Sequence, residues 1–260
     1  SNAEAATTEL KLNQHDLNIE SVEYFEKHSL LGPPPVGLNA DIPDFVKHVN
    51  SLSEPKKLDF EVKVEERFLL VRLPFELKKG EEIVIKTVST CKPTDNILEG
   101  IYYDYTPKGA PQTMITQCQQ YGFQRIVPCV DRMASKTFYT TTIVADERYT
   151  NVVTNGDLAP GFYDGKMNAT FQSIEEAFSS SSNKDIILKS NADSPTRKKV
   201  IKYYNHKVNM APYLFFLGCG TYDVYTKEVE YPDGDTFLLE ILCLPGIVTP
   251  EDAETSLVAL

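Results

Sequence analysis

The chain has 260 residues, 42% of them hydrophobic and 10% aromatic, so it can bury a sizeable core and is not a disordered segment. Its formal net charge of -11 and sequence pI of about 4.9 argue against nucleic acid or an anionic membrane surface as the main partner, because both would repel it. The sequence contains no run of eighteen apolar residues, so no transmembrane helix is predicted.

The cysteines indicate a reducing environment. They number five, an odd count, and stand at irregular spacings without a C-x-x-C pair: Cys91, Cys118, Cys129, Cys219 and Cys243. This pattern gives no disulfide framework and predicts reduced, mostly buried thiols. We therefore expect a cytoplasmic protein.

The first part of the chain is dominated by strand signals. Residues 1–3 read Ser-Asn-Ala, which we interpret as the remnant of an expression tag. A short helix is predicted over residues 41–52, after a proline-rich turn. Residues 58–91 alternate apolar and charged side chains and break at Lys79-Gly80. This period of two predicts two or three half-buried antiparallel strands.

The second part contains a polar stretch and a hairpin. Residues 168–207 include the runs SSSSN and NADSPTRKK and are predicted to form a polar insertion. Further on, Pro232-Asp233-Gly234 lies between two β-rich runs. It predicts a hairpin, because Asp-Gly tolerates the positive φ that tight turns need.

The chain ends in a predicted helix. Thr249 can cap it, and acidic residues fill its first turn, which suits the N-terminus of a helix. The whole pattern predicts an all-β fold, an antiparallel β-sandwich over residues 4–248 with short helical decorations. Residues 249–260 would begin a linker or helix that leads out of this domain.

Common catalytic motifs are absent from the sequence. No H-E-x-x-H, G-x-S-x-G, P-loop or G-x-G-x-x-G pattern occurs, and no two histidines have i, i+4 spacing. We therefore expect no metal ligand, no cofactor and no catalytic residue in this chain. A cysteine hydrolase that uses Cys118 or Cys129 with His206 as base is a weaker hypothesis, because buried, inert thiols are the commoner state.

Residues 114–138 (MITQCQQYGFQRIVPCVDRMASKTF) form the segment richest in polar and cysteine side chains. Arg125 and Asp131 stand six residues apart across a partly apolar turn. We interpret them as structural support for this loop, through a direct ion pair or through carboxylate-to-backbone hydrogen bonds. Taken alone, Gln117 and Gln119 are ordinary polar loop residues.

Three ordered blocks resemble one protein family. The stretch TMITQCQQYGFQRIVPCVDRMASKTFYTTTIVADERYTNVVTNGD closely resembles the signature of the N-terminal domain of zinc aminopeptidases of the aminopeptidase N family, in particular its bacterial alanyl aminopeptidase-like branch. NILEGIYYDYT upstream and MAPYLFFLGCGTYDVYTKEVEYPDGDTFLLEILCLPG downstream resemble further blocks of the family in the same order. The resemblance runs from about residue 9 to residue 260 and is weakest within the polar insertion.

The resemblance implies a saddle-shaped β domain that leans on a zinc-containing catalytic domain and lends its 114–138 loop to the active-site wall. In the family, the position of Gln117 and an acidic residue two positions later receive the free α-amino group of the substrate. Here the second position is Gln119. An amide oxygen accepts a hydrogen bond from an ammonium without cancelling its charge. Gln117 and Gln119 are thus the predicted substrate-binding residues, with a peptide N-terminus as ligand.

The sequence departs from the family pattern at both ends. The family's catalytic domain, with its G-x-M-E-N and H-E-x-x-H motifs, would begin after Pro250, so zinc is expected in a domain that this sequence does not include. The family's domain also begins with two strands before LKLNQHDLNIESVEY, for which the sequence has no room. An incomplete sheet would leave an exposed edge, which a partner chain or a second copy can cover.

The function implied is that of a non-catalytic N-terminal domain, inactive when isolated, which positions the free N-terminus of a peptide beside the catalytic domain of the same polypeptide. The alternative is a stand-alone, catalytically dead relative that binds peptides or another protein. Gln119 at the acidic position favours this alternative.

Overall fold

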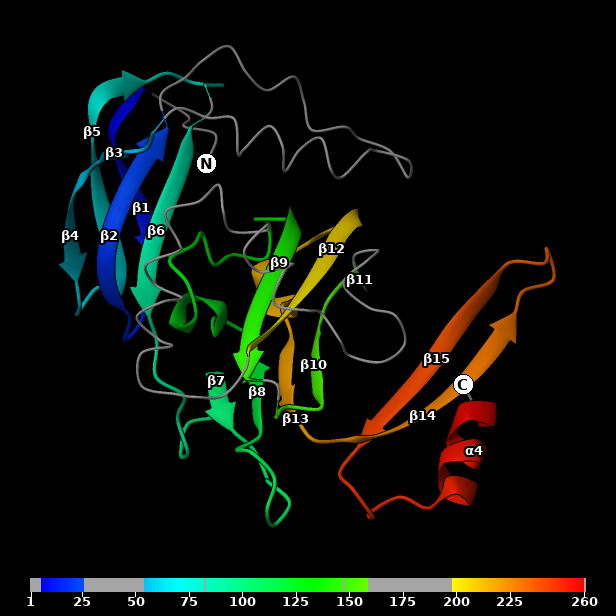
Figure 1. Cartoon of the computed structure of the whole chain (residues 1–260). Helices are drawn as coiled ribbons and strands as arrows, with labels where there is room; N and C mark the ends of the chain where they lie inside the picture. Colours follow the sequence, from blue (N-terminus) through cyan, green and yellow to red (C-terminus); the bar gives the residue numbers. More distant parts are fainter. Residues whose placement is uncertain (1–5, 26–53, 82, 147, 159–197, 260) are drawn as a thin grey trace.

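Antiparallel strands make up most of the structure (Figure 1). It is a computed structural model and describes residues 6–25, 54–81, 83–146, 148–158 and 198–259. The helix predicted over residues 41–52 and residues 168–197 of the predicted insertion lie outside the described residues.

Two three-stranded sheets pack face to face in the N-terminal part. Their strand orders are β1-β5-β4 and β3-β2-β6, and all neighbours are antiparallel. The bounds are β1 Thr7–Asn13, β2 Asn18–Phe25, β3 Lys56–Lys57, β4 Asp59–Lys63, β5 Phe68–Leu77 and β6 Val84–Thr90. The strands predicted within residues 58–91 are thus confirmed.

The core between these two sheets follows from the alternation of side chains along each strand. Leu69, Val71 and Leu73 of β5 share one face and are buried, and they pack against Val22 and Tyr24 of β2. Side chains two residues apart point to the same face of a strand, so one strand contributes a continuous apolar row. This packing makes residues 7–90 a small sandwich.

The following strands form a four-stranded and a three-stranded sheet. Their orders are β10-β13-β8-β7 and β11-β12-β9. The bounds are β7 Gly100–Tyr103, β8 Met114–Gln117, β9 Thr137–Asp146, β10 Asn151–Thr154, β11 Asp157–Leu158, β12 Lys198–Met210 and β13 Leu217–Gly220. Val152, Ile201 and Cys219 are buried between the two sheets.

The predicted polar insertion extends too far toward the C-terminus, because its last ten residues form part of a strand. Residues 198–207 belong to β12, which pairs with β9 from Lys198↔Asp146 to Asn205↔Tyr139. Ile201 is buried, and Tyr203 packs against the same core. The four lysines of this stretch conceal a strand in which Ile201 and Tyr203 stand two positions apart.

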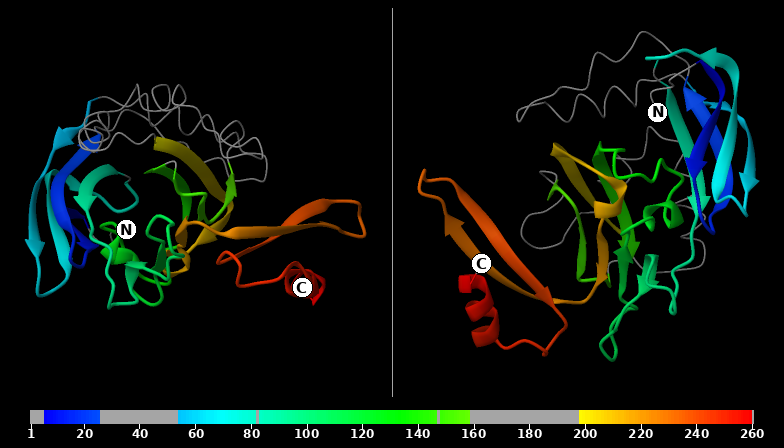
Figure 2. Two further views of the ribbon diagram at one scale, coloured as in Figure 1. Left: turned by 60° about the horizontal axis from the view of Figure 1, so that its bottom comes forward. Right: turned by 180° about the vertical axis from the view of Figure 1, so that it is seen from behind.

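The predicted hairpin and the C-terminal helix are confirmed. β14 (Asp223–Glu230) pairs with β15 (Thr236–Cys243), and Gly234 in the turn has φ +89°. α4 spans Pro250–Ala259, and the Thr249 hydroxyl accepts a hydrogen bond from the Asp252 N–H at 3.2 Å. Figure 2 shows the hairpin and α4 lying together beside the rest of the molecule.

The fold class is therefore all-β and antiparallel, as predicted. The helical pieces named here are short: η1 (Phe123–Arg125), η2 (Pro212–Leu214) and α4. None of the helices in the described ranges has the length and apolar character needed to cross a membrane.

Candidate functional site

The candidate site is the loop that follows β8. Gln117 ends this strand and pairs with Gly100 of β7. Gln117 and Gln119 are exposed, whereas Cys118 between them is buried at 1% exposure. The Gly122 N–H donates to the Cys118 carbonyl at 2.8 Å, and the peptide bond between Gln119 and Gln120 is cis. The two glutamines therefore face solvent from a backbone that is anchored by the thiol side chain.

Two glycines allow the loop to fold closely onto itself. A Cβ atom on Gly122 would lie 2.3 Å from the Gln117 carbonyl oxygen, which is far inside van der Waals contact. Gly100 has φ +73°, and a Cβ atom there would lie 2.7 Å from Cβ of Arg125. Only glycine fits at both positions without movement of the backbone.

Aromatic packing anchors η1 beneath the loop. Phe123 is buried, and its ring centroid lies 4.8 Å from that of Phe215 and 5.9 Å from that of Tyr139. Such tilted and edge-on contacts are favourable geometries for aromatic pairs. Burial raises the pKa of Tyr139 to about 12, so this ring stays neutral in the cluster.

Asp131 supports the loop through backbone hydrogen bonds. Its Oδ2 accepts the Gln124 N–H at 3.1 Å, and its own N–H donates to Oδ1 of Asn13 at 3.1 Å. The side chain is 3% exposed, and this burial raises its pKa. The hydrogen bond from Gln124 opposes that shift, because it stabilises the carboxylate.

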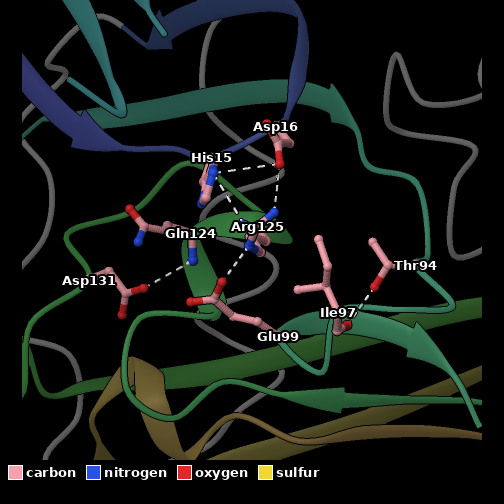
Figure 3. Close-up of polar contacts among 8 residues, drawn as sticks. All are labelled: His15, Asp16, Thr94, Ile97, Glu99, Gln124, Arg125 and Asp131. Carbon is pink, nitrogen blue, oxygen red and sulfur yellow. Dashed lines mark hydrogen bonds and ion pairs between the residues drawn. The ribbon is translucent and has the colours of Figure 1, made fainter. Parts of the chain in front are cut away.

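Arg125 is paired with carboxylates from two other segments (Figure 3). Its Nε donates to Oε2 of Glu99 at 2.7 Å, and its Nη1 donates to Oδ2 of Asp16 at 2.6 Å. Its Nη2 lies 3.2 Å from Nε2 of His15. The ion-pair partners of Arg125 are thus Glu99 and Asp16 rather than Asp131.

His15 remains neutral beside this guanidinium. Burial is the main cause that lowers its pKa, and the nearby charge of Arg125 lowers it further. Neutral imidazole can accept a hydrogen bond at Nε2, which suits the position of Arg125 Nη2. His15, Asp16, Glu99 and Arg125 also line a cavity of about 290 Å³.

The end of β1 and the turn that follows it bind the loop through their backbone as well. The Asn13 N–H donates to the Cys129 carbonyl at 2.6 Å, and the Cys129 N–H returns a bond to the Asn13 carbonyl at 3.0 Å. The His15 N–H donates to the Gln124 carbonyl at 2.9 Å. These backbone hydrogen bonds attach the loop to the N-terminal sandwich.

The surroundings of Cys118, which is buried, and Cys129, which is half-buried, count against cysteine chemistry here. Burial raises the pKa of Cys118 to about 12 and raises that of Cys129 still more strongly. Neither thiol is poised to form the thiolate that acts as a nucleophile. The side chain of His206 lies outside the described residues.

Zinc does not fit the part of the chain that the structure describes. No three His, Cys, Asp or Glu side chains there are grouped so that they could hold a metal ion. A zinc site needs at least three such protein ligands.

Solved structures share this fold. Legionella pneumophila aminopeptidase A, in complex with aspartic acid, matches with a TM-score of 0.57 at 15% identity, over 92% of this chain and 20% of that protein. An M1 zinc metallopeptidase from Deinococcus radiodurans matches with a TM-score of 0.56 at 11% identity, over 98% of this chain and 45% of that protein. At these identities the likeness is one of fold.

Comparison of sequences identifies the family, which the likeness of fold alone does not. Leukotriene A-4 hydrolase from Xenopus laevis is 29% identical over 80 residues, which are 30% of this chain and 13% of the hydrolase. The chain thus spans less than half the length of each of these relatives. The model of the peptidase M1 N-terminal domain matches residues 1–173, which are more than half of the chain. By this match, the chain belongs to the peptidase M1 family and carries its N-terminal domain.

Proposed function

We propose that this domain holds the free N-terminus of a peptide substrate beside the catalytic domain of a zinc aminopeptidase. The observation that carries the proposal is the pair of exposed glutamines, Gln117 and Gln119, on a loop whose backbone is fixed by buried neighbours. A fixed pair of amide oxygens can accept hydrogen bonds from an ammonium group at a defined place. The domain would thus set the position of the first residue and leave the hydrolysis to the second domain.

The relatives support this proposal. One solved neighbour is described as a two-domain M1 zinc metallopeptidase, and another form of the Deinococcus enzyme is bound to a Tyr-Ser-Ala substrate. This chain covers 45% of the first protein and 44% of the second. In the proposal, a catalytic domain of the same polypeptide supplies the zinc, and the isolated 260-residue chain is inactive.

The first test is to read the source gene beyond the codon for Leu260. An open frame that encodes H-E-x-x-H would supply the second domain that the proposal requires. A stop codon at that point would overturn the enzyme reading and leave a domain that binds without catalysing.

The second test uses the complete polypeptide with L-alanine p-nitroanilide as substrate. Gln117→Ala and Gln119→Ala should each raise KM roughly tenfold, because each removes a hydrogen bond to the charged amine. Gln112→Ala is the matched control, since Gln112 lies before β8 and binds Thr106 through its side chain. Unchanged KM in both loop variants would contradict the proposal.

The residue at position 119 separates the enzyme from the binding-module alternative. A carboxylate would neutralise the substrate ammonium, whereas the amide of Gln119 leaves its charge uncompensated. If the complete polypeptide cleaves the substrate with Gln119 in place, the enzyme reading stands. If cleavage appears only in Gln119→Glu, a stand-alone peptide- or protein-binding relative becomes the better description.

Self-association and cellular location belong to the same proposal. β1 lies at one end of its sheet, where a second copy can pair with its edge. A bulge between Thr7 and Glu9 interrupts the regular pairing of β1 with β5 near the start of β1. At this bulge the Thr7 hydroxyl donates to the Glu9 carbonyl at 2.8 Å. None of the five cysteines forms a disulfide, which favours a reducing compartment such as the cytoplasm. Light scattering would detect a dimer.

A further inference from the structure

We infer that Glu99 and Asp16 are positioning residues for the Gln117–Gln119 segment, and that both act through Arg125. The segment's role in amine binding rests on the proposed function, whereas its positioning by these two carboxylates does not. Neither carboxylate lies in the 114–138 loop, so each acts on the loop from another part of the chain.

The Glu99–Arg125 pair closes the loop at its base. Glu99 directly precedes Gly100, and Gly100 is the register partner of Gln117. Arg125 lies in η1, which follows the Gln117–Gln119 segment, and the Arg125 N–H donates to the Gly122 carbonyl at 3.1 Å. The 2.7 Å bond between Arg125 Nε and Glu99 Oε2 therefore joins the residue directly before β7, the strand that pairs with Gln117, to η1, which follows the Gln117–Gln119 segment.

The same guanidinium is also held from the side of the N-terminal sandwich. Asp16 has φ +57°, a conformation that few residues other than glycine, asparagine and aspartate tolerate. In this conformation its Oδ2 lies 2.6 Å from Arg125 Nη1. The turn at Asp16, between β1 and β2, thus brings a negative charge to η1 (Figure 3).

The two pairs differ in exposure, so their effects should differ in size. The side chain of Arg125 is 12% exposed, that of Glu99 is 34% exposed and that of Asp16 is 67% exposed. Water screens an exposed ion pair, whereas a half-buried one retains more of its interaction. Glu99 should therefore contribute more than Asp16 to holding the loop.

Hydrogen–deuterium exchange of the full 260-residue chain tests the positioning role. Glu99→Gln should speed exchange of the amides in residues 117–125 by roughly tenfold, since it weakens a hydrogen bond between charged groups. Asp16→Asn keeps a residue that tolerates positive φ and should speed this exchange by about threefold. Exchange in β14 should stay unchanged in both variants, which separates loop opening from global unfolding.

Glu61→Gln is the matched control. Glu61 lies in β4 and accepts a hydrogen bond from Arg72 Nη2 at 3.1 Å. β4 belongs to the β1-β5-β4 sheet, whereas β8, which carries Gln117, belongs to another sheet. Glu61→Gln replaces a paired carboxylate by an amide, as Glu99→Gln does, but it should leave hydrogen–deuterium exchange in residues 117–125 unaltered. If Glu99→Gln and Asp16→Asn behave like this control, the positioning role is overturned.

A ligand measurement on the same proteins separates positioning from the proposed function. L-alanine amide should shift the side-chain amide NMR signals of Gln117 and Gln119, whereas propionamide, which lacks the α-amine, should not. Glu99→Gln should weaken the response to L-alanine amide. Faster loop exchange without any response to L-alanine amide in the unaltered chain would uphold the positioning role and overturn amine binding by this domain. A full response in Glu99→Gln, despite a loosened loop, would overturn the inference that positioning by Glu99 serves the amine.

Discussion

Asn13 and Cys129 exchange two backbone hydrogen bonds, of 2.6 and 3.0 Å, although one lies in the first strand and the other beyond η1. The side chain of Asn13 adds a third contact, because its Oδ1 accepts the Asp131 N–H. The end of β1 therefore helps to hold the loop of the candidate site in place.

Asn13→Ala should remove only the side-chain contact and leave the two backbone bonds in place. The Asp131 N–H then loses its acceptor, so the free energy of unfolding should fall by about 1 kcal/mol. Urea denaturation followed by circular dichroism measures the change. Asn18→Ala is the control, since Asn18 makes an exposed contact with Thr90, and it should cost less than about 0.5 kcal/mol. Equal effects of the two substitutions would contradict the assigned role of Asn13.

Gly122→Ala tests the close packing of the loop. Gly122 has φ -75°, which alanine adopts freely, so we expect any cost to arise from contacts of its Cβ with the Gln117 carbonyl and with backbone atoms of Cys118 and Gly100. We expect a loss of about 2–3 kcal/mol in the free energy of unfolding, as for other overpacked positions. Gly109→Ala has open space around it but φ +86°, and it should cost about 1 kcal/mol. A smaller loss for Gly122→Ala than for Gly109→Ala would disprove the steric argument.

Asp131 should make the stability of the chain depend on pH. Its pKa is raised by burial, so the folded chain binds this proton more tightly than the unfolded chain does. The contribution of the protonated group is present below the ordinary pKa of an aspartate and is lost as the pH rises through the raised value. Asp131→Asn removes this dependence. Its stability relative to the unaltered chain should therefore improve from acid to neutral pH, in urea titrations at matched pH values. A constant difference would show that the burial of Asp131 has no such effect.

The N-terminal sandwich should depend strongly on Leu69. This side chain is 0% exposed and packs between the two sheets, so Leu69→Ala leaves a cavity and should cost about 2–5 kcal/mol. Val64→Ala, at a position 67% exposed, should change the free energy of unfolding by less than about 0.5 kcal/mol. The comparison needs only thermal or urea denaturation. A mild effect of Leu69→Ala would mean that the two sheets do not share one core.

Local sequence signals predicted much of this fold. The Asp233-Gly234 turn, the cap at Thr249 and the alternation of apolar and charged residues in β4 each depend on neighbouring residues, and such short-range preferences can be seen in one sequence. β12 was missed because its apolar positions are few and its lysines resemble those of a surface insertion.

The candidate site was harder to predict. The loop itself was visible from its composition, but Glu99 and Asp16 became its partners only through the pairing of distant strands. For Asp131, six positions after Arg125, the sequence left open a direct ion pair or carboxylate-to-backbone hydrogen bonds. The structure shows the second, because Asp131 accepts the Gln124 N–H while Arg125 pairs with other carboxylates. The signal that could have indicated Glu99 was its place directly before Gly100, within the family block NILEGIYYDYT.

The order of strands in the second pair of sheets also has a consequence for folding during synthesis. All strands of the first sandwich have been made once Thr90 is added, whereas β8, which carries Gln117, needs β13 as a neighbour. β13 ends at Gly220, and it is also the strand on which β10 pairs. Contacts this distant in sequence form slowly. A nascent chain therefore acquires its first hydrophobic core early, but the Gln117–Gln119 segment gains its supporting sheet only after Gly220 has left the ribosome.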